Sequence, residues 1–137
     1  MTPSRLLESA LYVTDLDAAE HFYGVVLGLE PAGKVAGRHL FFKCGDAIVL
    51  LFNAEATQVP PPPDARLPVP PHGTTGAGHM CFAASESEID AWKARLGEHG
   101  VAIEAEFEWP RGGRSIYFRD PSGNSLEFAN PTIWGMK

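Results

Sequence analysis

The feature that most constrains the fold of this chain is an internal repeat, because the same order of expected elements occurs on both sides of a proline-rich segment. In the first half, alternation and helical stripes predict a strand at 9–14, a helix from 17 to 28, and strands at 31–35, 39–44 and 47–52. In the second half they predict a strand at 79–83, a helix from 85 to 100, and strands at 102–107, 114–119 and 125–128. The order βαβββ therefore occurs twice.

The repeat predicts an α+β fold of two similar modules within one domain, residues 1–137. Module one spans residues 5–54, a proline-rich linker spans 55–77, and module two spans 78–131. An isolated four-stranded unit leaves one face of its sheet bare, so we expect the two modules to pack or to pair edge to edge.

Both expected helices begin with the spacing of a capping box. Asp17 and Glu20 have this spacing in module one, and Ser85 and Glu88 have it in module two. The linker between the modules carries seven of the twelve prolines, and proline resists helix and central strand. It is expected to be extended, serving as a functional flap, an inter-module connection or a plain surface connector.

Composition excludes several classes of protein. The net charge of −6, without a basic cluster, argues against a nucleic-acid or anionic-membrane partner. The longest apolar run, 47–52, is too short for a membrane span, and we find no secretory signal, so a cytoplasmic location is expected. In that compartment Cys44 and Cys81 are expected to be free thiols.

One carboxylate lies among apolar neighbours on the last expected strand. Strand alternation places Glu127 opposite Leu126 and Phe128, so that these two face the core and the carboxylate faces the other side of the sheet. Such a carboxylate needs a cationic partner, a shifted pKa or a metal ion. Its counterpart in module one is Val49 or Leu50, both apolar, so no further ligand is expected there.

Four segments together resemble a known family. They are ESALYVTDL at 8–16, FYGVVLGL at 22–29, GHMCF at 78–82 and YFRDPSGNSLE at 117–127. This set, which covers nearly the whole chain, is similar to the vicinal oxygen chelate superfamily of glyoxalases, bleomycin-resistance proteins, fosfomycin-resistance transferases and extradiol dioxygenases. The resemblance implies that paired βαβββ modules form a half-open barrel around one divalent ion, which a substrate chelates through adjacent oxygens.

The ligand positions of the family correspond to Glu8, His79 and Glu127 in this sequence. The first of these is more often histidine in the metal enzymes, and this set would have two carboxylates and one imidazole. Such ligands suit Zn²⁺, Mn²⁺, Fe²⁺, Mg²⁺ or Ni²⁺, and three of them leave positions open for water or substrate. Alternatively, Glu8 is a surface carboxylate and His79 a hydrogen-bonded core histidine.

Further residues are candidates for contact with a substrate. Tyr117 has the place of a substrate-contacting phenol in the family, or it fills the cavity wall. Arg111 and Arg114, within a glycine-containing hairpin, are either anion-binding or solvated. Trp109 and Phe52 line an apolar pocket or belong to the core, and Cys81 shares a strand face with His79.

The resemblance implies a metal-dependent enzyme of the glyoxalase type, a lyase or isomerase, acting on a small molecule. Glu8 or Glu127 would act as the catalytic carboxylate that moves a proton. Two alternatives remain open: a ring-cleaving dioxygenase, and a non-catalytic binding protein of the bleomycin-resistance kind. The protein is expected to be a homodimer.

Overall fold

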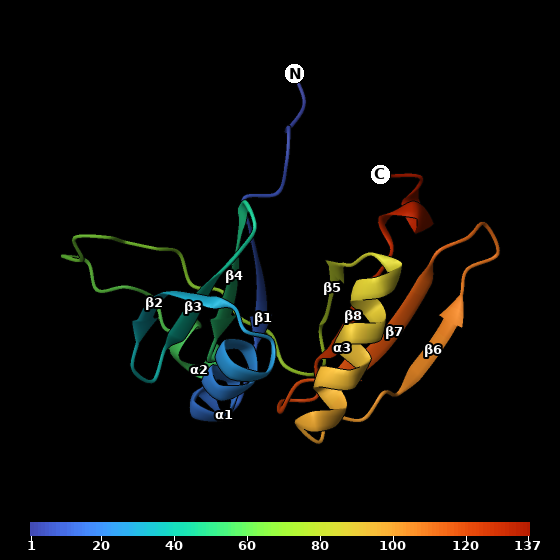
Figure 1. The fold of residues 1–137 in the computed structure, drawn as a ribbon. Helices are drawn as coiled ribbons and strands as arrows, with labels where there is room; N and C mark the ends of the chain where they lie inside the picture. The colour runs from blue at the N-terminus through green and yellow to red at the C-terminus, as the bar shows by residue number, and fades with distance from the viewer. The chain divides into compact units, whose positions relative to one another are not determined.

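A computed structural model describes residues 1–137 and divides the chain into two compact units, Met1–Gly76 and Ala77–Lys137. Each unit contains one four-stranded sheet with helices on one of its faces (Figure 1). The α+β class and the repeated βαβββ order are confirmed, and the two units are described separately below. None of the helices is both long and apolar enough to span a membrane.

The first unit contains a mixed sheet. Its elements are β1 (Glu8–Tyr12), α1 (Leu16–His21), η1 (Phe22–Val26), β2 (Glu30–Val35), β3 (His39–Cys44), β4 (Ala47–Phe52) and α2 (Ala54–Thr57). The strands lie in the order β1-β4-β3-β2, with β1 parallel to β4 and the remaining neighbours antiparallel.

The second unit has the same topology. Its elements are β5 (His79–Ala83), α3 (Glu86–Glu98), β6 (Ala105–Glu108), β7 (Arg114–Arg119), β8 (Ser125–Ala129) and η2 (Pro131–Trp134). The strand order is β5-β8-β7-β6, and the first strand of the unit is again parallel to the last.

The backbone hydrogen bonds show that the two units match residue by residue. In the first unit the amide of Ile48 donates to Leu7 O at 3.0 Å, just before β1. In the second unit the amide of Ser125 donates to Gly78 O at 2.9 Å, just before β5. The halves can therefore be aligned without a slip.

This alignment assigns each functional position in one unit a counterpart in the other. Glu8 and His79 are both the first residues of their strands. In the strand pairing Ala10 lies opposite Leu50, and two residues into β5 Cys81 lies opposite Glu127. The module-one counterpart of Glu127 is therefore Leu50 and not Val49.

The core of the second unit lies between its sheet and α3. Leu126 and Phe118 are fully buried, and Trp92 of α3 stacks on Phe128 with ring centroids 4.4 Å apart. Burial of these large apolar groups is the main stabilising contribution to such a layer. The prediction that Leu126 and Phe128 face the core is confirmed, and Glu127 is consequently on the other face.

The helix starts differ from expectation in one unit. Ser85 and Glu88 form the predicted capping box. In the first unit, however, Asp15 is the N-cap, because its Oδ1 accepts the amide of Ala18 at 3.0 Å, and the proposed role of Asp17 was wrong. The N-cap residue is the last residue with an extended backbone before the helix, and Asp15 has this extended backbone.

Other boundaries also shift. A short helix, α2, opens the segment expected to be extended; it begins after Asn53, whose side chain accepts the amide of Glu55. The strand expected at 102–107 is found at Ala105–Glu108, and the one expected at 9–14 is Glu8–Tyr12. The remainder of the proline-rich segment, from residue 58 to 78, has no regular structure.

Candidate functional site

His79 and Glu127 come together on neighbouring strands of the second unit. The Nε2 atom of His79 lies 3.3 Å from Oε2 of Glu127. The Nδ1 atom of the same ring lies 3.0 Å from the carbonyl oxygen of Ser125. A carbonyl can only accept, so Nδ1 carries the hydrogen, and in the neutral ring Nε2 presents its lone pair toward the carboxylate.

The carboxylate of Glu127 is removed from water. Its side chain is 6% exposed, whereas that of His79 is 52% exposed. The second oxygen, Oε1, is buried and has no hydrogen-bond partner. A buried carboxylate with an unsatisfied oxygen is unfavourable unless a cation neutralises it.

A buried turn positions these two side chains. Asn124 accepts the amide of Gly78 through Oδ1 at 2.8 Å and donates from Nδ2 to Asp120 Oδ2 at 2.9 Å. Asp120 Oδ1 in turn accepts the amides of Ser122 and Asn124. Since Gly78 precedes His79 and Asn124 precedes β8, the turn fixes the starts of both strands relative to each other. The D-P-S-G-N sequence is therefore a positioning element as well as a tight turn.

Tyr117 and Cys81 flank the carboxylate on the adjacent strands, each directly opposite Glu127 in the strand pairing. Removal from water and then the charge of Glu127 raise the pKa of Cys81 to about 12. Removal from water together with Glu127 likewise raises the pKa of Tyr117 to about 12. Both groups are protonated at neutral pH, so in the metal-free protein they offer hydrogens and not negative charge.

Aromatic rings extend from this cluster toward the edge of the sheet. Tyr117 stacks between His79 and Phe107, with ring centroids 6.2 Å and 5.6 Å away. Phe107 meets Trp109 edge-on, and Trp109 Nε1 donates to Ser115 Oγ at 2.8 Å. Trp109 is 37% exposed and Phe107 43%, so this face is an apolar surface beside the carboxylate and not part of the core.

Arg114 does not face this cluster. Its guanidinium contacts three carboxylates: Glu86 at 3.0 Å, Asp90 at 2.6 Å and Glu106 at 3.4 Å. These ion pairs connect α3 and β6 to β7 and leave no free fork for an external anion. We therefore propose no substrate contact for Arg114. Arg111 is exposed in the turn before β7 and stays a candidate for anion binding.

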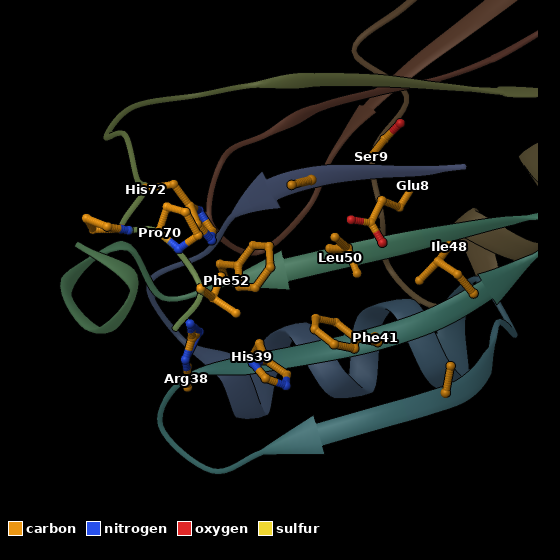
Figure 2. A pocket seen from close by; sticks show the side chains of 14 residues that line it. Glu8, Ser9, Arg38, His39, Phe41, Ile48, Leu50, Phe52, Pro70 and His72 are labelled. Carbon is orange, nitrogen blue, oxygen red and sulfur yellow. The ribbon is translucent and has the colours of Figure 1, made fainter. Parts of the chain in front are cut away.

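The first unit carries a pocket of about 890 Å³ on its sheet (Figure 2). Its wall includes the expected residues Glu8 and Phe52. The lining residues are Glu8, Ser9, Ala10, Ala32, Arg38, His39, Phe41, Ile48, Leu50, Phe52, Val69, Pro70, Pro71 and His72.

The proline-rich segment supplies one wall of this pocket. His72 Nδ1 lies 2.7 Å from the hydroxyl of Tyr12, and its ring meets Phe52 edge-on at a centroid distance of 4.6 Å. The amide of His72 also donates to Thr57 O at 3.0 Å. The segment therefore belongs to a binding surface of the first unit where it passes the sheet, and is not only a connector.

The structure thus brings four expected residues together in the second unit, namely His79, Cys81, Tyr117 and Glu127, and places Glu8 and Phe52 in the first. Neither unit by itself assembles three His, Cys, Asp or Glu side chains as a metal site. The sequence did not single out Arg38, and it showed no ligand spacing for His39 and His72, although all three line the pocket. His39 and Phe41 are two positions apart on one strand and therefore share a face, and this spacing is the signal that could have revealed part of the pocket wall.

Comparison with known proteins determines the family. Residues 5–128 match the Glyoxalase/Bleomycin resistance protein/Dioxygenase superfamily. The chain belongs to this superfamily. The resemblance of the four sequence segments is thereby confirmed.

Individual relatives are enzymes. The chain is similar to the structure of lactoylglutathione lyase from Agrobacterium tumefaciens, with 43% identity, a TM-score of 0.90 and coverage of 99% of this chain and 100% of that one. It is 30% identical over 120 residues to glutathione transferase FosA of Serratia marcescens, covering 85% of this chain and 74% of that protein. A metallothiol transferase, FosB of Shouchella clausii, is 41% identical over 61 residues, 40% of this chain and 39% of that protein. These likenesses support an enzyme of the glyoxalase superfamily and leave its reaction class open.

Proposed function

We propose that the protein is a metal-dependent enzyme of the glyoxalase type, a lyase or isomerase that acts on a small substrate bound through two adjacent oxygens. His79 and Glu127 would hold the divalent ion together with Glu8, the residue at the matching strand start of the first unit. The observation that carries the proposal is the approach of His79 Nε2 to Oε2 of the buried Glu127 at 3.3 Å.

The residues present fit a divalent cation. His79 Nε2 and Glu127 Oε2 face each other at 3.3 Å, and the buried Glu127 Oε1 makes no hydrogen bond. A proton on His79 or a cation would satisfy the facing pair, and a cation that bridges the two side chains would also neutralise the buried carboxylate. Imidazole with carboxylate is a donor set that suits Zn²⁺, Mn²⁺, Fe²⁺ or Ni²⁺, and Mg²⁺ is compatible with the carboxylates.

When bound, the ion would act as a Lewis acid toward the substrate oxygens. The side chains of the protein would do the remaining work. Glu8 is exposed and borders the pocket, so it would exchange a proton with the substrate carbon. Tyr117, protonated at neutral pH, would donate a hydrogen bond to a substrate oxygen as negative charge develops there. The row of Phe107 and Trp109 would exclude water from one side of the substrate.

The lyase and isomerase class is favoured by the 43% identity to a lactoylglutathione lyase over nearly the whole chain. A thiol transferase is the second candidate, supported by the similarity to the two transferases. A homodimer is also proposed, and it is tested by the mass in solution from light scattering.

Elemental analysis of protein purified without chelator tests the metal, and about one divalent ion per chain is expected. His79→Ala and Glu8→Gln should each lower that content, whereas Glu98→Gln, on the exposed end of α3, should not. Turnover of lactoylglutathione tests the lyase. Transfer of glutathione to an electrophilic acceptor tests the transferase. Full metal occupancy in His79→Ala would refute the proposed centre.

A further inference from the structure

The pocket of the first unit has opposite charges at its two ends. Glu8 lies beside Ile48 at the start of β4, and His39 lies beside Phe52 at its end, as the strand pairing shows. Four residues along a strand correspond to roughly 13 Å, and the two strand spacings from β1 to β3 add roughly 10 Å across the sheet, so the backbones of Glu8 and His39 are roughly 16 Å apart. Arg38 lies next to His39, so an acidic group and a cationic group border opposite ends of the same pocket (Figure 2).

Flat apolar side chains line the space between these ends. Leu50 and Phe52 of β4 and Phe41 of β3 face the pocket (Figure 2). Phe41 and Phe52 meet edge-on with centroids 5.8 Å apart, and His39 stacks parallel on Phe41 at 4.1 Å. Such rings favour an aromatic or other flat apolar body, which can make both face and edge contacts.

Arg38 differs from its counterpart in the other unit. The amide of Asn53 donates to Arg38 O and that of Asn130 to Arg114 O, so the two arginines occupy the same place in the repeat. Arg114 is bound by three carboxylates. Arg38 has no carboxylate partner, and its Nη1 is buried without a hydrogen bond. An unpaired guanidinium at the end of an apolar pocket is a site for an anion.

His39 adds a second polar group at this end. Its Nδ1 is also buried without a partner. Removal from water and then the charge of Arg38 lower the pKa of His39, so the ring is neutral at pH 7. A neutral imidazole can donate one hydrogen bond without competing with Arg38 for the charge of an anion.

We propose that this pocket binds a molecule with an aromatic or flat apolar body and a terminal carboxylate, and that Arg38 recognises the carboxylate while His39, Phe41 and Phe52 hold the body. Insofar as it concerns the substrate, this inference rests on the proposed function. With Glu8 as a metal ligand, the adjacent oxygens of the substrate would lie at the opposite end from its carboxylate. The substrate class would then be an acid with an aromatic or flat apolar body and an oxygenated head.

The test uses 3-phenylpropionate as the probe and the neutral, equally shaped 3-phenylpropanamide as its control. Each is titrated into the full chain, with and without EDTA, while amide signals are followed by NMR. We expect the carboxylate to shift signals of Leu50, Phe52 and His39 and to bind roughly ten times or more tighter than the amide, since a charge-assisted hydrogen bond is at stake.

Three variants locate the charge. Arg38→Gln should weaken 3-phenylpropionate by roughly tenfold or more and leave 3-phenylpropanamide unchanged. Arg38→Lys should retain part of the difference in affinity between 3-phenylpropionate and 3-phenylpropanamide. Arg95→Gln, on the exposed side of α3, should retain all of that difference.

Equal binding of the two probes to the unaltered protein would overturn the inference, and this comparison needs no variant to fold. Signal shifts confined to the second unit, or no shifts at the solubility limit of the probe, would also overturn it. The metal centre is judged separately, because the titration in EDTA does not depend on a bound ion. If the unaltered protein binds no probe while the His79→Ala variant loses its metal, the pocket is refuted and the metal centre is supported.

Discussion

Leu50 occupies in the first sheet the position that Glu127 occupies in the second. Each lies opposite the third residue of the neighbouring parallel strand, Ala10 in one case and Cys81 in the other. One copy of the repeat therefore has a buried carboxylate where the other has an apolar floor. The two units are equivalent in backbone and different in chemistry, which separates the proposed ion-binding function from the proposed recognition of an apolar body.

Glu127→Gln should abolish metal binding without destabilising the metal-free protein. The amide keeps the size of the side chain but removes a buried charge that has an unsatisfied oxygen. In EDTA the free energy of unfolding should stay within about 1 kcal/mol of the unaltered protein or rise. Elemental analysis and urea unfolding measure the two effects. Glu108→Gln, an exposed substitution on β6, is the control, and retention of about one ion per chain in Glu127→Gln would contradict the assignment.

Asn124→Ala should weaken both the fold and the metal centre. The substitution removes the acceptor of the half-buried Gly78 amide and the amide that donates to Asp120 Oδ2, which should lower the free energy of unfolding by about 2–4 kcal/mol. It also releases the start of β5, which carries His79, so metal affinity should fall.

A matched control for this variant is Ile89→Ala in the core of the same unit. Ile89 is fully buried, so the substitution should lower the free energy of unfolding by a comparable amount, about 2–5 kcal/mol. Metal affinity, measured by competition with a chelating dye on folded protein, should be unaffected there. An equal loss of affinity in both variants would show that Asn124 acts only through overall stability.

Glu88→Gln should remove a pH-dependent contribution to stability. The hydrogen bonds of Glu88 to Ser85 lower its pKa from 4.5. A lowered pKa stabilises the folded state above the unfolded pKa, and this contribution is lost as pH falls through the folded pKa. The difference in unfolding free energy between the two proteins should therefore be present at pH 7 and vanish in acid. Glu98→Gln, at the opposite end of α3, should instead be neutral or slightly stabilising, because it removes negative charge from a helix C-terminus.

Arg114→Met should destabilise the second unit and leave ligand binding intact. The substitution removes ion pairs to three carboxylates, and the arginine side chain is only 16% exposed. We expect a loss of about 1–3 kcal/mol in the free energy of unfolding, reduced at high salt. Binding of 3-phenylpropionate should be unchanged, the reverse of Arg38→Gln. Weaker binding of 3-phenylpropionate with an unchanged free energy of unfolding would instead indicate that Arg114 binds the anion.

The sequence predicted the repeat and the side of the sheet on which Glu127 lies, because both follow from local periodicity. Leu126 and Phe128 bracket the carboxylate, and alternation leaves no other face for it. The N-cap was misplaced because Asp15 and Asp17 lie two positions apart in the sequence, and only the structure shows that the helix begins between them, so that Asp15 caps it and Asp17 lies in its first turn. The bonding of η1, in which Leu27 donates to Phe22 O, has no sequence signal that we recognised.

The partners of Arg114 and the pocket wall could not be predicted because both depend on contacts between distant segments. The carboxylates that bind Arg114 come from a helix and a neighbouring strand, up to 28 positions away. His72 contacts Tyr12 across 60 positions. Spacing along the chain contains no information about such contacts, whereas strand and helix periodicity is local.

The Asp120–Asn124 turn makes no use of a cation, yet it sets the separation of the imidazole and the carboxylate. The ligands would thus be rigid before any ion arrives, and loading would demand little reorganisation. Ions of similar radius could then exchange readily in a fully folded molecule. Which metal the protein carries in a cell would be decided by relative abundance more than by folding, and its turnover would change with the metal supply.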